Sequence, residues 1–518
     1  MELSSYISES RKRSILAVLM ISSVLIWLDN TVLSIALETL ADPARGLGAT
    51  PAELQWATGA YTLVFATLMF TAGALGDSYG HRSMLGLGLV VFACASIWAA
   101  YAANPGQLIA ARALMGAGAA FIMPANFAIL LWTFTGPGRA TAIAISSTNA
   151  GIGMAAGPVV AGALLSHFWW GSIFLINVPI VVLALVGTLA LVPNFRTPSA
   201  RSLDPLGMVL SIAGLASLCY GLIHAGQVTR WKAAGVWAPI ILGTILLTLF
   251  LVVELRTDAP SFNPRLLARR TFGGANAAMA LLFFSVAAIT FYNAFYMQGA
   301  LGFSPMKAGL ANIPTAIGAV VGAPLGARLV RTWSLRQVAI PSFLVAAATM
   351  GAYTLLNQTT SLTWVATLLF VQGLTVGMVM GPVTGALLST LPLEESGTGS
   401  AITNTVRQAG SVMGIAVGGT IMSIAYRGAI EPWLAGIAPS QADRARISAE
   451  QARNLADTHD LPDLHSAADA AFIHAMHVGA AWIAGATLVG AAILAFALRP
   501  GAQPRRPDIR QVRRPADA

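Results

Sequence analysis

Charged residues are scarce in this chain of 518 residues, since Asp, Glu, Lys and Arg together make up only 10% of it. A water-soluble domain of ordinary composition carries about 25% charged residues. Hydrophobic residues account for 56% of the chain, so the polar side chains that remain cannot cover the surface of a protein this size. This shortage of charged residues excludes a soluble globular protein and predicts an integral membrane protein.

Further absences narrow the function. Both cysteines, Cys94 and Cys219, fall inside apolar runs, which argues against a disulfide framework and a cysteine metal site. The chain has no G-x-x-x-x-G-K-[ST] loop, so ATP does not drive it. Its histidines lack tight ligand spacing, and no catalytic constellation recurs at membrane depth. We therefore expect no enzyme activity, no metal and no cofactor, and a proton gradient as the energy source.

Apolar runs of about 20 residues, long enough to cross a bilayer, recur along nearly the whole chain. We place fourteen of them, at residues 14–37, 54–76, 83–102, 107–132, 139–166, 169–192, 205–225, 235–255, 273–299, 306–330, 337–357, 361–388, 397–426 and 472–498. The predicted fold is an all-α integral membrane protein with 14 transmembrane helices. Two pseudo-symmetric six-helix halves, 14–192 and 273–498, flank two inserted central helices within 205–255.

The distribution of positive charge predicts the orientation. With the N-terminus in the cytoplasm, twenty of the 30 Lys and Arg residues lie on the inside and eight on the outside, while Arg112 and Arg407 lie within spans. We expect a multi-pass protein of the cytoplasmic membrane with two cytoplasmic ends, a tail over 1–13 and a basic tail over 499–518. An acidic, polar loop over about 427–471 would lie outside. The positive charges form no single patch, so nucleic acid is not an expected partner.

Two ionisable side chains lie at membrane depth in the first half. Asp29 is about fifteen residues into the first span, near the bilayer midplane, where an ionised carboxylate is costly unless it meets a partner or a cavity. Arg112, in the fourth span, is the expected partner because it belongs to the same half. A carboxylate that is alternately exposed and paired can bind and release a proton. The alternative is a static buried pair.

An internal repeat supports the division into halves. The loop after the second span contains Gly73, Asp77, Gly80 and Arg82, and residues 327–336 repeat it in worn form after the tenth span. Paired halves around a midplane cavity are a common plan of secondary transporters. The repeat therefore indicates a transporter, with the full gating function in the first copy.

The fifth span carries small residues at spacings of four and five, namely Gly153, Gly157 and Gly162, together with Pro158. Small residues let a neighbouring helix approach closely, and a proline removes one backbone hydrogen bond and permits a bend. This pattern predicts a hinge. A plain small-residue helix interface is the alternative.

Several polar and aromatic side chains within the spans are candidates for lining a substrate cavity. Aromatic rings hold cationic and aromatic ligands by stacking and cation–π contact. The candidates are Asn30, Trp56, Tyr61, Tyr292, Tyr296, Asn404 and Arg407. Each aromatic residue alone is also explained by packing, and Arg407 equally by a structural hydrogen-bond hub with Asn404 and Gln408.

These motifs, in this order, resemble the major facilitator superfamily and in particular its fourteen-segment drug:proton antiporter branch. Residues 28–37 resemble the first-span motif of the branch, and residues 73–82 resemble the loop motif of the superfamily. Residues 112–118 look like its fourth-span arginine motif, and residues 153–162 look like its fifth-span antiporter motif. Residues 169–179 resemble the start of the sixth span.

The resemblance implies proton-coupled efflux of hydrophobic drugs or antibiotics by alternating access. It implies proton coupling at Asp29 and Arg112, and a cytoplasmic gate at Asp77 and Arg82. Dication exporters of the branch carry further acids in the second half, whereas spans nine to fourteen contain none here, which favours monocationic or neutral substrates. The partners would be this small molecule, protons and membrane lipid, and the protein would work as a monomer. A lipid or metabolite exporter or flippase, and a non-transporting membrane sensor or scaffold, remain alternatives.

Overall fold

The computed structural model describes residues 8–134, 136–194, 204–228, 234–257, 263–389, 391 and 393–498. Every regular element within these ranges is a helix. A chain in hydrocarbon must satisfy its backbone N–H and C=O groups internally, and a helix does so within one segment. The predicted basic tail over 499–518 lies outside the described residues.

The first group of helices begins at Glu9, so residues 9–13, expected in a tail, belong to the first helix. The group contains α1 (Glu9–Ala41), α2 (Pro51–Tyr79), α3 (His81–Ala100), α4 (Pro105–Thr133), α5 (Gly136–His167), α6 (Ser172–Leu175) and α7 (Asn177–Leu191). Local signals set several of the starts. At the start of α2, for example, the Thr50 hydroxyl accepts a hydrogen bond from the backbone N–H of Glu53. The Glu53 carboxylate in turn accepts one from the backbone N–H of Thr50.

Two further groups complete the chain. The inserted pair is α8 (Pro205–Gln227) and α9 (Ala234–Arg256). The last group contains α10 (Pro264–Ala268), α11 (Arg270–Phe295), the π-helix η2 (Tyr296–Ala300), α12 (Pro305–Ala311), α13 (Ile313–Thr332), α14 (Leu335–Ala352), η3 (Tyr353–Leu355), α15 (Leu362–Ser389), α16 (Leu393–Ile430), η4 (Glu431–Leu434), α17 (Pro439–Ala445), α18 (Ala449–His459) and α19 (Pro462–Ala497).

Twelve helices among the described residues are long and apolar enough to cross a membrane. The number becomes thirteen when α2, which bends by 50° after Met69, is taken as one span. The predicted fourteen is therefore not reached by this measure. The difference lies at the expected span 139–166, where α5 contributes only a shorter apolar helix, Gly151–His167.

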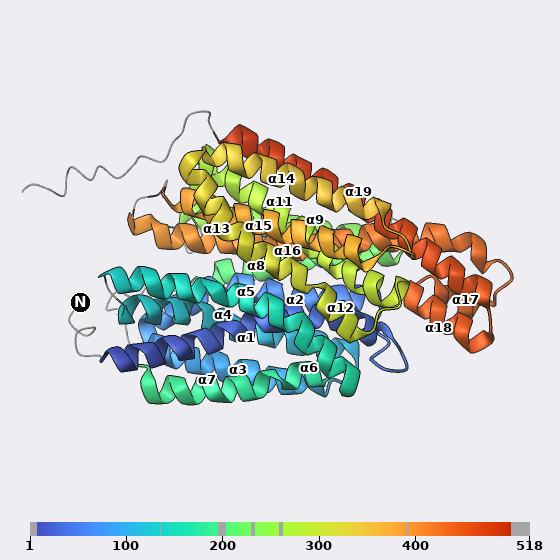
Figure 1. The fold of residues 1–518 in the computed structure, drawn as a ribbon, viewed down its shortest axis with the longest axis horizontal. Helices are drawn as coiled ribbons and strands as arrows, with labels where there is room; N and C mark the ends of the chain where they lie inside the picture. Colours follow the sequence, from blue (N-terminus) through green and yellow to red (C-terminus); the bar gives the residue numbers. More distant parts are fainter. Residues whose placement is uncertain are drawn as a thin grey trace, which may run out of the picture.

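The first and last groups lie side by side as two bundles, one with α1 to α7 and the other with α11, α13 to α16 and α19 (Figure 1). The inserted helix α8 packs against one helix of each bundle. Its Leu215, Cys219 and Ile223 form an apolar cluster with Leu63 of α2 and Val412 of α16. Helix α8 therefore covers one side of the boundary between the two halves, and α9 packs against α8.

The expected polar loop over about 427–471 is largely helical. Its elements η4, α17 and α18 form a helical cap, residues 431–459, which projects at one end of the molecule (Figure 1). Helix α18 is amphipathic and buries Ala452, Leu455 and Ala456 on its apolar face. Hydropathy averaged along α18 hides this face because its polar residues outnumber the apolar ones. We call this end of the molecule the cap end.

Candidate functional site

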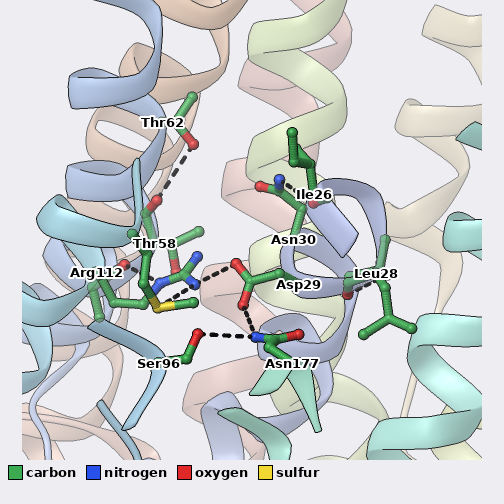
Figure 2. A network of polar contacts seen from close by, with 12 residues as sticks. Ile26, Leu28, Asp29, Asn30, Thr58, Thr62, Ser96, Arg112 and Asn177 are labelled. Atoms are coloured by element: carbon green, nitrogen blue, oxygen red, sulfur yellow. Dashed lines mark hydrogen bonds and ion pairs between the residues drawn. The ribbon is translucent and has the colours of Figure 1, made fainter. Parts of the chain in front are cut away.

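A buried ion pair joins two helices of the first half. The carboxylate Oδ2 of Asp29 in α1 lies 2.6 Å from Nη1 of Arg112 in α4, and the two side chains are 3% and 1% exposed. Figure 2 shows the two groups facing each other at the centre of a polar network. With water excluded, removal of either partner leaves an uncompensated buried charge on the other. A proton on Asp29 would have the same effect on the pair, because it removes the negative charge.

Two further side chains complete the environment of Asp29. The amide of Asn177, the first residue of α7, donates to Asp29 Oδ1 at 3.0 Å and lies 3.4 Å from the hydroxyl of Ser96 in α3 (Figure 2). The carboxylate is therefore held by α4 and α7 together. Sequence reasoning quoted Asn177 only within the sixth-span motif and missed Ser96. For Asn177 the available signal was an amide side chain next to an apolar run.

Arg112 is enclosed by apolar and backbone groups on its remaining sides. Its Nε donates to the carbonyl of Ala57 in α2 at 3.3 Å. Its guanidinium carbon lies 4.5 Å from the ring centre of Tyr61 and 6.0 Å from that of Phe174. A cation over an aromatic face is stabilised by the ring quadrupole, more strongly when water is excluded. Tyr61, expected in a substrate cavity, thus forms a wall of the ion pair.

The fifth-span motif brings α5 against helices of both halves. A Cβ added at Gly153 or Gly157 would collide with Trp27 or Thr31 of α1, and one at Gly162 would lie 2.7 Å from the Pro305 carbonyl oxygen in α12. Pro158 lies inside α5 between these contacts. The small residues therefore allow α5 to touch the helix that carries Asp29 and a helix of the opposite half.

The predicted gating loop is a tight connection between α2 and α3. Gly80 has a φ of 97°, a conformation that residues with a Cβ rarely adopt, and a Cβ there would collide with the Asn194 side chain. The Arg82 guanidinium donates to the carbonyl of Leu189 in α7 at 2.6 Å. The loop is thus tied to the end of α7.

The other two members of this loop motif lie on the last turns of α2. Asp77 lies 3.3 Å from Nε2 of His81, the first residue of α3. Gly73 faces Pro124 of α4 at ordinary van der Waals distance. The motif therefore connects α2, α3, α4 and α7 within the first half.

The aromatic cavity candidates are not brought together. Trp56 packs against the apolar cluster between α2, α8 and α16. Tyr292 is buried beside Gly418 and Gly479, and the Tyr296 hydroxyl donates to the carbonyl of Asn357 at 2.8 Å. Asn30, next to Asp29, is exposed and donates to the carbonyl of its own helix four residues back.

Arg407 and Asn404 form a local hydrogen-bonded pair in α16. The Arg407 guanidinium donates to Asn404 Oδ1 at 2.6 Å and lies 5.0 Å from the ring centre of Phe283 in α11. Its Nε is buried without a hydrogen bond. Of the expected hub, only the contact with Asn404 is seen among the described residues, and the Nε donor remains available for a ligand or a water.

Comparison with known proteins identifies the class. The family described as the Major Facilitator Superfamily matches residues 19–415. The chain belongs to this superfamily. It is a multi-pass membrane protein and a secondary transporter, not an enzyme. The fold agrees, because a bacterial homologue of the human lysosomal transporter Spinster, in an inward-facing and unoccupied conformation, aligns with a TM-score of 0.66 at 17% identity over 95% of this chain and 97% of that one.

The relatives place the chain within the superfamily more closely. It is 31% identical to the multidrug efflux pump LfrA of Mycolicibacterium smegmatis over 93% of this chain and 96% of the relative. It is 32% identical to the puromycin resistance protein pur8 of Streptomyces alboniger over 78% and 81% of the two chains. The chain is therefore related to the drug efflux pumps of the fourteen-span branch.

Proposed function

We propose that the protein is a proton-coupled antiporter that exports hydrophobic drugs or antibiotics from the cytoplasm by alternating access. The buried Asp29–Arg112 pair carries this proposal, because it places a titratable charge and its partner at membrane depth on different helices. Its relatives LfrA and pur8 are a multidrug efflux pump and a drug resistance protein. Both termini would face the cytoplasm and the helical cap would face outward, with α5 as the fifth of fourteen spans.

The coupling step is an exchange of one proton at Asp29. When Asp29 is ionised, it accepts from Arg112 and Asn177 and holds α1, α4 and α7 together. A proton taken from the outside neutralises the carboxylate, so both donors lose their charged acceptor and α1 can shift. Release of that proton to the cytoplasm restores the pair. Motion of α1 reaches the opposite half through α5, with Pro158 as the hinge.

The composition of the second half supports a monocationic or neutral substrate. No Asp or Glu occurs from residue 263 to residue 393, which covers α11 to α15. A dication needs more than one carboxylate to replace its hydration. Arg407, with its unbonded Nε, is the polar group that we propose for substrate orientation in this half.

Transport into liposomes under an imposed pH gradient tests the proposal. Accumulation of ethidium, a fluorescent monocation, should depend on the gradient for the wild type and be lost in Asp29→Asn. Asp443→Asn is the matched control, because Asp443 is 75% exposed and pairs with Arg446 on the helical cap. Uphill transport at wild-type rate in Asp29→Asn would show a static pair. Lipid movement without ethidium transport would favour a flippase instead.

A further inference from the structure

A second buried charge cluster lies at the cap end. Arg453 of α18 has its Nε 2.6 Å from Asp469 of α19, and its Nη1 lies 3.5 Å from Glu450 of α18 and 3.8 Å from Glu38 of α1. Glu38 is nine residues beyond Asp29, roughly 14 Å along the helix, so the two sites are separate. Because α1 and α19 belong to different halves, the guanidinium bridges the boundary between them.

The two halves meet at this end through other contacts as well. The Gln298 side chain of η2 donates to the carbonyl of Ile35 in α1 at 2.7 Å. Gly299, the next residue, has no Cβ, and an added one would lie 2.6 Å from Arg453 Nη1. The structure is therefore closed at the cap end, with the charge cluster inside the closure.

The cluster contains more negative than positive charge. One guanidinium faces three carboxyl groups, and the four side chains are between 7% and 16% exposed. Burial lowers the pKa of Arg453, but Glu450, Glu38 and Asp469 outweigh that effect and hold its pKa above the ordinary value, so it stays charged. Two uncompensated negative charges in a low dielectric are costly. A proton on one carboxyl group relieves most of that cost.

The neighbouring titratable groups do not supply the missing charge. His465 of α19 lies 3.8 Å from Asp469 and Arg45 follows α1, but these side chains are 42% and 70% exposed and therefore screened by water. Tyr426 of α16 faces the cluster and donates its hydroxyl to the carbonyl of Ala445. The excess negative charge of the cluster therefore stays on the carboxyl groups of Glu38, Glu450 and Asp469.

Buried atoms without a hydrogen bond gather in this cluster, and they include Nη1 and Nη2 of Arg453 as well as two carboxyl oxygens. Glu38 Oε2 and Glu450 Oε1 are buried without a hydrogen bond, although both carboxyl groups converge on Arg453 Nη1 and face each other. Glu450 and Gln55, whose Oε1 is likewise unsatisfied, line a cavity of about 40 Å³. A cavity needs about 10–15 Å³ of such volume to admit a water, so this one has room for a water next to the Glu450 carboxyl group.

We propose that Glu38 and Glu450 form a second proton-binding site, and that the proton they share locks the two halves together at the cap end. Two carboxyl groups can hydrogen-bond to each other only when one of them carries a proton. Opening of the cap end would carry Glu38 away with α1, hydrate both groups and release the proton. The closed state is therefore favoured at low pH and loses its advantage as the pH rises. The lock depends neither on the substrate nor on Asp29.

Distance measurements between spin labels in lipid nanodiscs test the lock. Labels on Ala103→Cys and Gln358→Cys, exposed positions in loops of opposite halves, report opening in a background in which Cys94 and Cys219 are replaced. A difference of one unit between the pKa of the carboxyl pair in the closed state and in the open state changes the equilibrium between these states tenfold. The open fraction should therefore rise about tenfold from about pH 5.5 to about pH 8.5. In Glu38→Gln and, separately, in Glu450→Gln, the cap end should stay closed at both pH values.

The control variants separate this proposal from the proposed function. Asp443→Asn should respond to pH as the wild type does. A response that persists in Asp29→Asn and disappears when Glu450→Gln is added would support the lock, whatever the transport assay shows. A wild-type response in the correctly folded Glu38→Gln and Glu450→Gln variants would overturn it. If the response is instead lost in Asp29→Asn alone, the lock fails while the role of Asp29 stands.

Discussion

The hydroxyl of Thr31 in α1 donates a hydrogen bond of 3.1 Å to the carbonyl of Gly153 in α5. One turn further along α5, Gly157 leaves the space that the Thr31 side chain occupies. The helix that carries Asp29 is thus held against the proposed hinge helix by this hydrogen bond and by close packing at Gly157. A methyl group added at Gly157 would disturb both.

Gly157→Ala should therefore destabilise the protein by about 1–3 kcal/mol, the usual cost of overpacking, and reduce transport. Thr31→Ala in the same chain removes the hydroxyl that the new methyl group meets and should recover part of the loss. Gly385→Ala in α15 is the control, because nothing lies within 4 Å of a Cβ there. Thermal unfolding in detergent and ethidium transport are the measurements. Equal melting temperatures for Gly157→Ala and Gly385→Ala would contradict the proposed close contact.

Replacement of the ring beneath Arg112 should separate cation–π stabilisation from hydrogen bonding. Tyr61→Phe keeps the aromatic face 4.5 Å from the guanidinium, so stability and transport should stay close to wild type. Tyr61→Leu removes the aromatic face and part of the ring volume, so it should lose the cation–π contribution of about 0.5–2 kcal/mol, a further packing cost and most coupled transport. Thermal unfolding and ethidium transport of the two variants are the measurements. Equal stability and transport in the Phe and Leu variants would show that the aromatic face contributes nothing at Arg112.

Removal of the Asn177 amide should change the pH dependence of transport. The amide donates to Asp29 Oδ1, and a hydrogen bond to a charged group contributes about 1.5–3 kcal/mol. Asn177→Ala favours the protonated carboxyl group, so the pH midpoint of transport should move upward by about one to two units. Asn276→Ala, whose amide bonds only to a carbonyl of its own helix, should leave the midpoint unchanged. A midpoint that does not move in Asn177→Ala would remove Asn177 from the coupling site.

Gly80→Ala should combine two costs in the loop between α2 and α3. A left-handed φ costs a residue with a Cβ about 1–2 kcal/mol, and the new methyl group would also collide with Asn194. Asn194→Ala in the same chain removes the collision but not the backbone cost, so stability should recover only in part. Gly302→Ala, at a φ of 62° in open space, reports the backbone cost alone. Full recovery in the double variant would show that conformation plays no part at Gly80.

Much of the fold follows from composition and hydropathy. The scarcity of charge and the recurrent apolar runs predicted membrane helices, and the family comparison confirms a major facilitator transporter. The expected span at 139–166 falls on the continuous helix α5, in which Gly151–His167 is a shorter apolar helix. The polar stretch 427–471 was expected to be a loop, and its short amphipathic helices were missed because they do not raise the average hydropathy.

The candidate site was predicted in part. Asp29 and Arg112 stand out because a charge inside an apolar run is rare and costly, and the structure places them 2.6 Å apart. Ser96 gave no comparable signal, because a hydroxyl can satisfy itself on its own helix. Tyr292 and Tyr296 are buried in the second half, and their place in a substrate cavity stays a prediction, since the sequence does not tell which face of a helix meets its neighbours.

The sequence by itself determined that the protein lies in a membrane, and that Asp29 and Arg112 must find partners there. These are local properties, set by the cost of burying charge and exposing apolar surface. The tertiary structure alone decided which partners they find. Asn177 reaches Asp29 from 148 positions away, and Arg453 of the cap reaches Glu38 across the two halves. Such pairings depend on which helices pack together, and spacing along the chain does not encode that.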